Sequence, residues 1–314
     1  MTEELVDTAA RHDLAQVPMR DPANTSGLLE VFRRRYLLRL MVRREIRARY
    51  IGSKFGLAWS YINPTVRFFT FYFVFGIILN RGAVPHFAIH LFAGMVLVHF
   101  FTETFNSGTR SIMSNKMVVQ KMALPREMFP VASMLVSLYH TGPQVVVLVI
   151  ACFATGSFAP DVVGMAAALL GFTIVLLLGT AMGLMFSAIN VLFRDFTRVV
   201  QTLTSMIPFS VPMMYPYTMV SDRFGTGIWH DLYLLNPVGE AVLLMQRAFW
   251  ITTVSQQDVE DTRAAGSLFE GGVAPNFPPH LFERGVVMLV ACLVFLGFAQ
   301  WIFSRLDDRL PERL

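Results

Sequence analysis

Charged side chains inside apolar stretches are the first candidates for chemistry in this sequence. Arg67 is the only basic residue of the apolar run 57–79, and Glu103 is the only acidic residue of the run 87–105. A charge near the centre of a membrane costs several kcal/mol unless it faces protein or water. We therefore predict that Arg67 faces a polar path or a subunit interface, with Glu103 as its possible partner. The alternative is that Arg67 reaches back to the inner membrane surface.

Aromatic side chains follow Arg67 closely. They are Phe68, Phe69, Phe71, Tyr72, Phe73 and Phe75. Six aromatic residues within eight positions cover every face of a helix, so most of them must contact lipid or neighbouring helices. The alternative is that one face of this helix stacks on sugar rings or guides a lipid tail.

Other patterns argue against enzymatic chemistry. His86 and His90 have the spacing of paired metal ligands on a helix, but no Cys, Asp or Glu nearby offers a third ligand. The phosphate-binding pattern G-x-x-x-x-G-K-[ST] does not occur in the sequence. We therefore predict that the chain is not an enzyme and that it binds no metal or cofactor itself.

Long apolar helices must position these residues. The 314 residues are 54% hydrophobic and 15% charged, whereas about a quarter of the residues of a soluble domain are charged. A helix needs about 20 mostly apolar residues to cross a bilayer. Six runs qualify, at 57–79, 87–105, 131–155, 162–189, 199–220 and 285–303. The predicted fold class is an all-α polytopic membrane protein with six transmembrane helices.

The basic residues are distributed unevenly between the two sides of these spans. Lys and Arg number 11, 4, 2 and 3 in the segments on one side, against 1, 0 and 4 on the other. Because basic residues stay inside, we predict a multi-pass protein of the cytoplasmic membrane with both termini in the cytoplasm. The net charge of +4 then reflects topology and does not indicate binding to nucleic acid.

The segments outside the spans divide the chain further. Residues 1–27 are polar, without the apolar core of a signal peptide, and are predicted to be a disordered cytoplasmic tail. Residues 28–56 are predicted to form a basic amphipathic helix at the membrane surface, ahead of a transmembrane domain at 57–304. Residues 305–314 form a second cytoplasmic tail.

The predicted surface helix carries eight arginines between residues 28 and 50. Its apolar residues fall into two stripes at helical spacing. One stripe contains Leu29, Phe32, Tyr36 and Leu40, and the other contains Val31, Leu38 and Val42. Such a helix can lie on anionic lipid headgroups. The alternative is that it also binds a cytoplasmic protein partner.

The segment 221–284 lies on the predicted outer side. The stretch Trp229–Trp250 is apolar but is interrupted by Asn236 and Pro237, so it is too short to cross the membrane and is predicted to be re-entrant. The stretch 252–280 is rich in Gly and Pro and is predicted to be an exposed loop.

A resemblance to a known family connects these features. The chain resembles the type-2 ABC exporter permeases that move lipid-linked polysaccharides, including O-antigen, teichoic acid and mycobacterial galactan. The motifs that carry the resemblance extend over most of the chain. They are Arg44-Glu45, Arg49-Tyr50, Gly56, Trp59, Pro64, Pro125-Arg126-Glu127, Phe193-Arg194-Asp195 and Asn236-Pro237.

The resemblance implies a homodimer of permeases that binds two copies of a separate ABC ATPase, which uses ATP and Mg²⁺. The lipid-linked polysaccharide and membrane lipid are the other implied partners. The ATPase is expected to dock on Arg43, Arg44, Glu45, Arg49, Lys116, Lys121, Arg126, Glu127, Arg194 and Asp195. The transport path is assigned to Arg67, Phe68, Phe69, Tyr72 and Tyr215, and an outer gate to Asn236 and Pro237.

Two other functions are weighed against this expectation. An ion-coupled transporter can use Arg67, His99 and Glu103 as a proton relay, although no inverted repeat is found in the sequence. A membrane enzyme acting on a lipid-linked sugar needs acidic groups on the outer side, and the outer acids form no recognisable pair.

Overall fold

The computed structural model describes residues 27–51, 55–78, 84–122, 124–156, 158–225, 227–255, 257, 258, 260 and 277–307. The predicted tail up to residue 26, most of the outer loop 252–280 and the end of the C-terminal tail lie outside the described residues. Every regular element in the described part of the chain is a helix. The predicted all-α class is confirmed for these residues.

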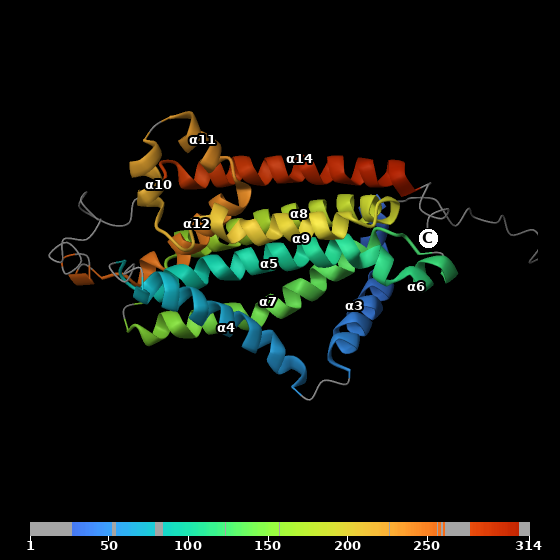
Figure 1. Cartoon of the computed structure of the whole chain (residues 1–314), viewed down its shortest axis with the longest axis horizontal. Helices are drawn as coiled ribbons and strands as arrows, with labels where there is room; N and C mark the ends of the chain where they lie inside the picture. Colours follow the sequence, from blue (N-terminus) through green and yellow to red (C-terminus); the bar gives the residue numbers. More distant parts are fainter. Residues whose placement is uncertain are drawn as a thin grey trace, which may run out of the picture.

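Five helices are long and apolar enough to cross a membrane. They are Trp59–Ile78, which is α4 (Trp59–Phe71) continued by the π-helix η2 (Tyr72–Ile78), α5 (Phe87–Ser114), α7 (Met128–Ala154), α8 (Val162–Leu192) and α14 (Leu281–Asp307). Each overlaps one of the predicted spans. α5, α8 and α14 run along the long axis of the molecule (Figure 1).

The fifth predicted span, 199–220, is interrupted in the structure. α9 (Phe196–Ser210) ends before Pro212, and α10 (Tyr217–Phe224) begins after Pro216. A proline in a helix interior removes a backbone hydrogen bond and clashes with the preceding turn. The Gln246 side chain donates a hydrogen bond of 2.8 Å to the Pro212 carbonyl in this bend. The count of six spans therefore stays a prediction.

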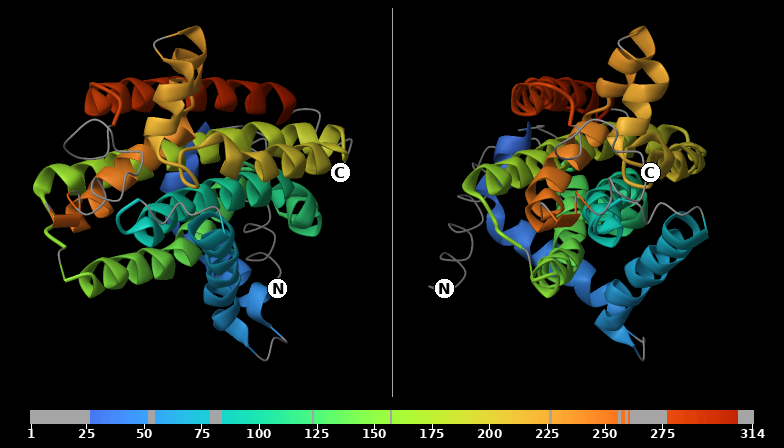
Figure 2. Two further views of the ribbon diagram at one scale, coloured as in Figure 1. Left: turned by 60° about the vertical axis from the view of Figure 1, so that its left-hand side comes forward. Right: turned by 90° about the vertical axis from the view of Figure 1, so that its left-hand side faces the viewer.

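α5 is the central helix of the bundle. It packs against α7, α8, α9 and α12 (Pro237–Phe249), and an end-on view places it in the middle of the helices (Figure 2, right). Gly108 lets α5 approach α8 closely, because a Cβ atom at this position would lie 2.8 Å from the Gly183 Cα. Small residues permit such close packing between membrane helices.

Short helices occupy one end of the bundle, which we call the outer end. α10 and α11 (Ile228–Leu234) project there, and α12 is packed between α5, α8 and α14 (Figure 1). α12 has 13 residues, which are too few to cross a bilayer, and most of its side chains are buried. Its re-entrant character stays a prediction.

The opposite end, which we call the inner end, carries the basic N-terminal helices. α2 (Gly27–Arg33) and α3 (Arg35–Tyr50) form two pieces of the predicted surface helix, with η1 (Gly56–Ala58) following and α6 (Lys116–Lys121) nearby (Figure 1). Val31 and Leu38 are buried against Met128, Val131 and Ala132 at the start of α7. One of the two predicted apolar stripes therefore attaches these helices to their own bundle.

Candidate functional site

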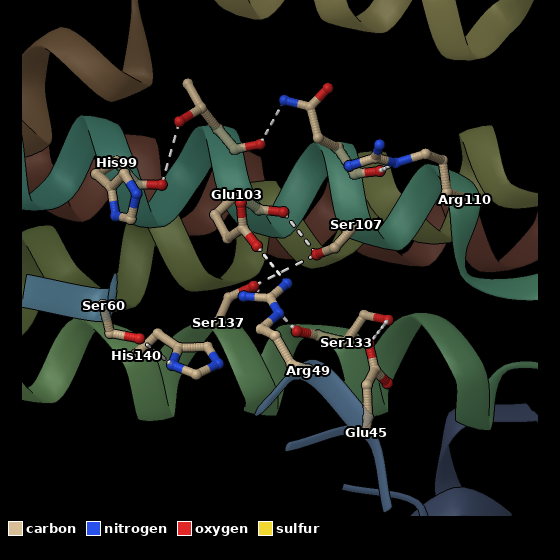
Figure 3. Close-up of polar contacts among 12 residues, drawn as sticks. Glu45, Arg49, Ser60, His99, Glu103, Ser107, Arg110, Ser133, Ser137 and His140 are labelled. Atoms are coloured by element: carbon tan, nitrogen blue, oxygen red, sulfur yellow. Dashed lines mark hydrogen bonds and ion pairs between the residues drawn. The ribbon is translucent and has the colours of Figure 1, made fainter. Parts of the chain in front are cut away.

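Polar side chains follow two neighbouring faces of α5 in an otherwise apolar sequence. Within each face they are spaced four residues apart, so they lie on the same side of the helix. The first face carries His99, Glu103 and Ser107, and the second carries Thr102, Asn106 and Arg110. The first face points towards α7 and α3, as Figure 3 shows. The second points towards α9, where the Asn106 Nδ2 donates to the Thr204 Oγ1 at 2.9 Å.

α7 offers matching polar groups to the first face. The Gln144 Nε2 lies 3.1 Å from the His99 Nδ1, and the Ser137 and Ser107 hydroxyl oxygens are 3.4 Å apart. Gln144 and Ser137 are both buried. Polar groups buried among helices must find hydrogen-bond partners within the protein. The two helices therefore form a polar seam inside the bundle.

An ion pair joins this seam to the N-terminal helix. The Arg49 Nη2 of α3 lies 2.6 Å from the Glu103 Oε1 of α5 (Figure 3). The Arg49 and Glu103 side chains are 39% and 27% exposed, so the pair is accessible to solvent in this chain. Arg49, predicted to bind an ATPase, thus contacts the acidic residue that was predicted as a partner of Arg67.

A cleft of about 480 Å³ opens on the other side of Glu103. Its walls come from α4, α5, α9 and the bend after α9. The polar and charged lining residues are Arg67, His99, Thr102, Glu103, Asn106, Arg110, Gln201, Thr204 and Ser205. Pro64, Phe71, Met95, Val98, Pro208 and Met213 complete the wall. The three residues of the possible proton relay therefore line one cleft.

The cleft has more positive than negative charge. Arg67 lies close enough to His99, and Arg110 close enough to Glu103, for electrostatic interaction. Among the residues that the structure describes, no carboxylate forms an ion pair with Arg67 or Arg110. Glu103 is the one carboxylate among the residues that line the cleft, and it is paired with Arg49, which lies outside this lining. Such a surface favours an anionic ligand.

Two further polar contacts hold α3 on the bundle. Arg44 donates to the Asn115 side chain after α5, and the Ser133 hydroxyl donates to the Glu45 Oε1 at 3.4 Å. Burial raises the pKa of Glu45 above its ordinary value, although the neighbouring Arg49 acts in the opposite direction. These residues have partners within their own chain, and their predicted role in docking is not tested by these contacts.

The Pro125-Arg126-Glu127 motif is packed inside the inner end. The Arg126 Nη1 donates to the backbone oxygen and the Oδ1 of Asp307, each at 2.8 Å, and joins the start of α7 to the end of α14. Glu127 is fully buried and accepts a hydrogen bond of 3.1 Å from Gln300. Burial raises the pKa of the Glu127 carboxyl. The side chain of Glu127 is therefore not part of the exposed surface.

The other predicted docking residues lie at the surface of the inner end. Arg43, Lys121, Arg194 and Asp195 are exposed, and Lys116 is half-buried. The second apolar stripe of the N-terminal helices is exposed beside them, with Leu29, Phe32, Tyr36 and Leu40 at 81%, 63%, 70% and 44% exposure. The N-terminal helices thus have one face on the bundle and an apolar, arginine-rich face that is uncovered in this chain.

The predicted path aromatics are separated by the structure. Phe68 and Tyr72 stack on each other and pack against Phe92 and Phe87 of α5, whereas Phe69 is 61% exposed. Of the five predicted path residues only Arg67 lines the cleft. No periodicity in the sequence separates these helix faces, because every face carries aromatic residues.

The predicted gate residues begin the buried helix α12. The Asn236 Oδ1 accepts from the Val238 backbone nitrogen at 3.0 Å, and Pro237 occupies the first turn. This is a common way to start a helix. The Asn236 Nδ2 also donates to the Ser210 carbonyl at the end of α9, at 3.3 Å. The pair thus fixes α12 to α9, and its role as a gate stays a prediction.

Sequence reasoning missed a polar cluster at the outer end. The Arg284 Nε lies 3.5 Å from the Glu240 Oε2, whose side chain is completely buried. Burial raises the pKa of Glu240 to about 7, against the opposing effect of Arg284. A second polar pair lies at this end, where the Tyr215 and Tyr233 hydroxyl oxygens are 3.3 Å apart. An arginine directly before a predicted span and an acid within an apolar helix were the available signals.

The chain is similar in sequence to known proteins. The family model described as ABC-2 type transporter matches residues 36–249. The O-antigen export system permease protein RfbA of Myxococcus xanthus is 25% identical over 225 residues, which cover 70% of this chain and 83% of that protein. The protein of the same name from Klebsiella pneumoniae is 24% identical, with 70% and 83% covered. The polysialic acid transport protein KpsM of Escherichia coli is 22% identical, with 65% and 78% covered.

Proposed function

The chain belongs to the ABC-2 type transporter family, and on this basis we propose that it is the permease subunit of an ATP-driven polysaccharide exporter. Its cargo is a polysaccharide linked to a polyprenyl diphosphate, of the O-antigen, teichoic acid or galactan type. The observation that carries the proposal is the family match over residues 36–249, together with relatives that are named as O-antigen and polysialic acid transport proteins.

The energy for transport comes from a separate ABC ATPase, which binds ATP and Mg²⁺. Its docking surface is the uncovered face of the N-terminal helices, where Leu29, Phe32 and Tyr36 lie among arginines. Exposed apolar residues bordered by charges are typical of protein interaction sites. Arg43, Lys121 and Arg194 extend this surface, and the uneven distribution of basic residues supports its location in the cytoplasm.

The functional unit is a homodimer with one ATPase on each permease. The cleft beside α4 and α9 faces the second copy, and the two clefts together form the path. α9 has an apolar stripe with Val199, Leu203 and Met206 exposed, and α4 has another with Val66 and Phe69 exposed. These stripes border the charged cleft and provide apolar area for a subunit contact at its rim.

Export assays in the native cell test this function. Deleting the gene should abolish the surface polysaccharide and cause its lipid-linked form to accumulate at the inner face of the cytoplasmic membrane. The full chain should also copurify with a co-expressed ABC ATPase and stimulate its ATP hydrolysis. An unchanged surface polysaccharide in the deletion strain would contradict the proposal. Transport by the purified chain without any ATPase would support the ion-coupled alternative instead.

A further inference from the structure

The position of Glu103 between α3 and the cleft provides the starting observation. Its carboxylate contacts Arg49 at 2.6 Å on one side, and the residue lines the cleft on the other. Arg49 itself is not part of the cleft wall. The charge that the cleft presents therefore depends on a residue from a helix outside it.

The arginines of the cleft, unlike its carboxylate, have no described ion-pair partner. Arg67 and Arg110 line it without a described acidic partner, whereas the only carboxylate of the wall is neutralised by Arg49. If Arg49 leaves, the Glu103 carboxylate becomes available to Arg110, with which it already interacts electrostatically. A carboxylate freed in this way competes with any anionic ligand for the same arginines.

Few polar contacts hold α3 in the position that keeps Arg49 on Glu103. Besides this pair, the contacts among the described residues are Arg44–Asn115 and the Ser133–Glu45 hydrogen bond, and all three are at least partly exposed. Exposed polar contacts of this kind each contribute at most about 1 kcal/mol. Apolar contacts of Leu38 with the start of α7 anchor the first part of α3. A partner protein bound to the uncovered face can therefore displace the last part of the helix, which carries Arg49, by breaking mainly these polar contacts.

We propose that the Arg49–Glu103 pair is a charge switch that lets the cleft hold a phosphate or diphosphate group when α3 is seated and expels this group when α3 withdraws. Arg49 is a positioning residue that acts through Glu103, while Arg67 and Arg110 contact the anion. The proposal rests on the proposed function, because the anion is the diphosphate of the transported lipid-linked glycan and the ATPase moves α3. It identifies how the inner end communicates with the path.

Binding of two probes to the full chain, purified with its ATPase in nanodiscs of zwitterionic lipid, tests the switch. Farnesyl diphosphate and inorganic pyrophosphate should both bind saturably to the unmodified protein. Arg49→Ala should weaken both by about tenfold or more, since an uncompensated carboxylate then faces the ligand. The double variant Arg49→Ala/Glu103→Gln should bind within about twofold of the unmodified protein, because the competing charge is gone.

Arg47→Ala provides the matched control, since it removes an exposed arginine of the same helix for which the structure describes no contact with Glu103, and it leaves the cleft charge unchanged. It should bind both probes like the unmodified protein. Unchanged binding by Arg49→Ala would overturn the switch. Failure of the double variant to recover would assign Arg49 a purely structural role and would also overturn it.

The remaining outcomes separate this proposal from the proposed function. If neither probe binds saturably to the unmodified protein, the cleft is not an anion site, even when glycan export in cells still requires the chain. Displacement of the probes by phosphatidylglycerol would assign the phosphate to a bulk lipid headgroup and would overturn its assignment to the cargo. Loss of export without loss of probe binding in Glu103→Gln, with ATP hydrolysis continuing, would support the expulsion step.

Discussion

Arg126 and Arg49 both hold a carboxylate at short range, but the two pairs lie in opposite surroundings. Arg126 and Asp307 retain 17% and 5% exposure and are surrounded by the packed inner end, beside the buried Glu127. Arg49 and Glu103 retain 39% and 27% and border an open cleft. The buried pair joins two membrane helices, and the exposed pair joins α3 to the wall of the cleft. The comparison indicates that a buried ion pair is costly to break and holds the structure together, whereas a solvent-exposed pair can be broken at low cost.

The largest expected effect is at the buried pair. Arg126→Ala leaves Asp307 without its guanidinium partner in a packed site, and should lower the free energy of unfolding by about 4 kcal/mol. A thermal unfolding scan of the purified chain measures this loss. Asp195→Asn, an exposed acid at the same end, is the control and should change stability by less than about 0.5 kcal/mol. Equal losses for both variants would remove the distinction by burial.

The Glu240–Arg284 pair extends the comparison, because its acid is buried but accepts no hydrogen bond from the arginine. The pKa of Glu240 is raised from 4.5 to about 7. Between these pH values the folded state keeps a proton that the unfolded state has released, so stability should fall as pH rises through this window, by up to about 3 kcal/mol.

The free energy of unfolding, measured between about pH 4 and pH 8, checks this dependence, because both pKa values lie within this range. Glu240→Gln should flatten the curve over this range. Glu283→Gln, an exposed acid one residue before Arg284, should leave the curve unchanged. A Glu240→Gln variant that keeps the full slope would show that another group titrates here.

The exposed pair should contribute little to stability. Arg49→Ala should cost at most about 1 kcal/mol, because solvent screens the pair and the Glu103 side chain regains freedom. The same variant should nevertheless reduce polysaccharide export strongly. Measuring unfolding and export on one preparation checks both parts, and a stability loss as large as that of Arg126→Ala would contradict the comparison.

The smallest effect is expected at Ser133. Its hydrogen bond to Glu45 is long, at 3.4 Å, and partly exposed. Ser133→Ala should therefore change the free energy of unfolding by about 0.5 kcal/mol or less. Export should also stay close to that of the unmodified chain, because the cleft charge is untouched. A strong loss of export would indicate that Glu45 has a larger part in holding α3.

Local sequence properties predicted the helical class and, within a prediction of six spans, the five long apolar helices. They also singled out Arg67 and Glu103, which the structure places in the lining of one cleft. Apolar length and isolated charge are visible within a single segment, and they act directly on membrane insertion. The broken fifth span was missed because average hydropathy over 199–220 does not record the effect of Pro212 and Pro216 on the backbone.

Pairings between distant segments were beyond this reasoning. Arg49 and Glu103 are 54 positions apart, and Arg126 and Asp307 are 181 apart. No local spacing distinguishes an arginine that will be buried from one that will stay exposed, since both precede apolar segments. The division of the N-terminal apolar residues into a buried and an uncovered stripe was visible as two stripes, but which one packs on α7 required the fold.

The first and the last described helices, α2 and α14, meet at the inner end. Leu28 of α2 packs against the buried cluster that contains Phe303 of α14, and Arg126 is held by Asp307, the last described residue of that helix. The contacts of α2 with the bundle are therefore complete only after α14 has been synthesised and inserted. A chain that is cut short, or whose last helix inserts wrongly, presents an unseated α2.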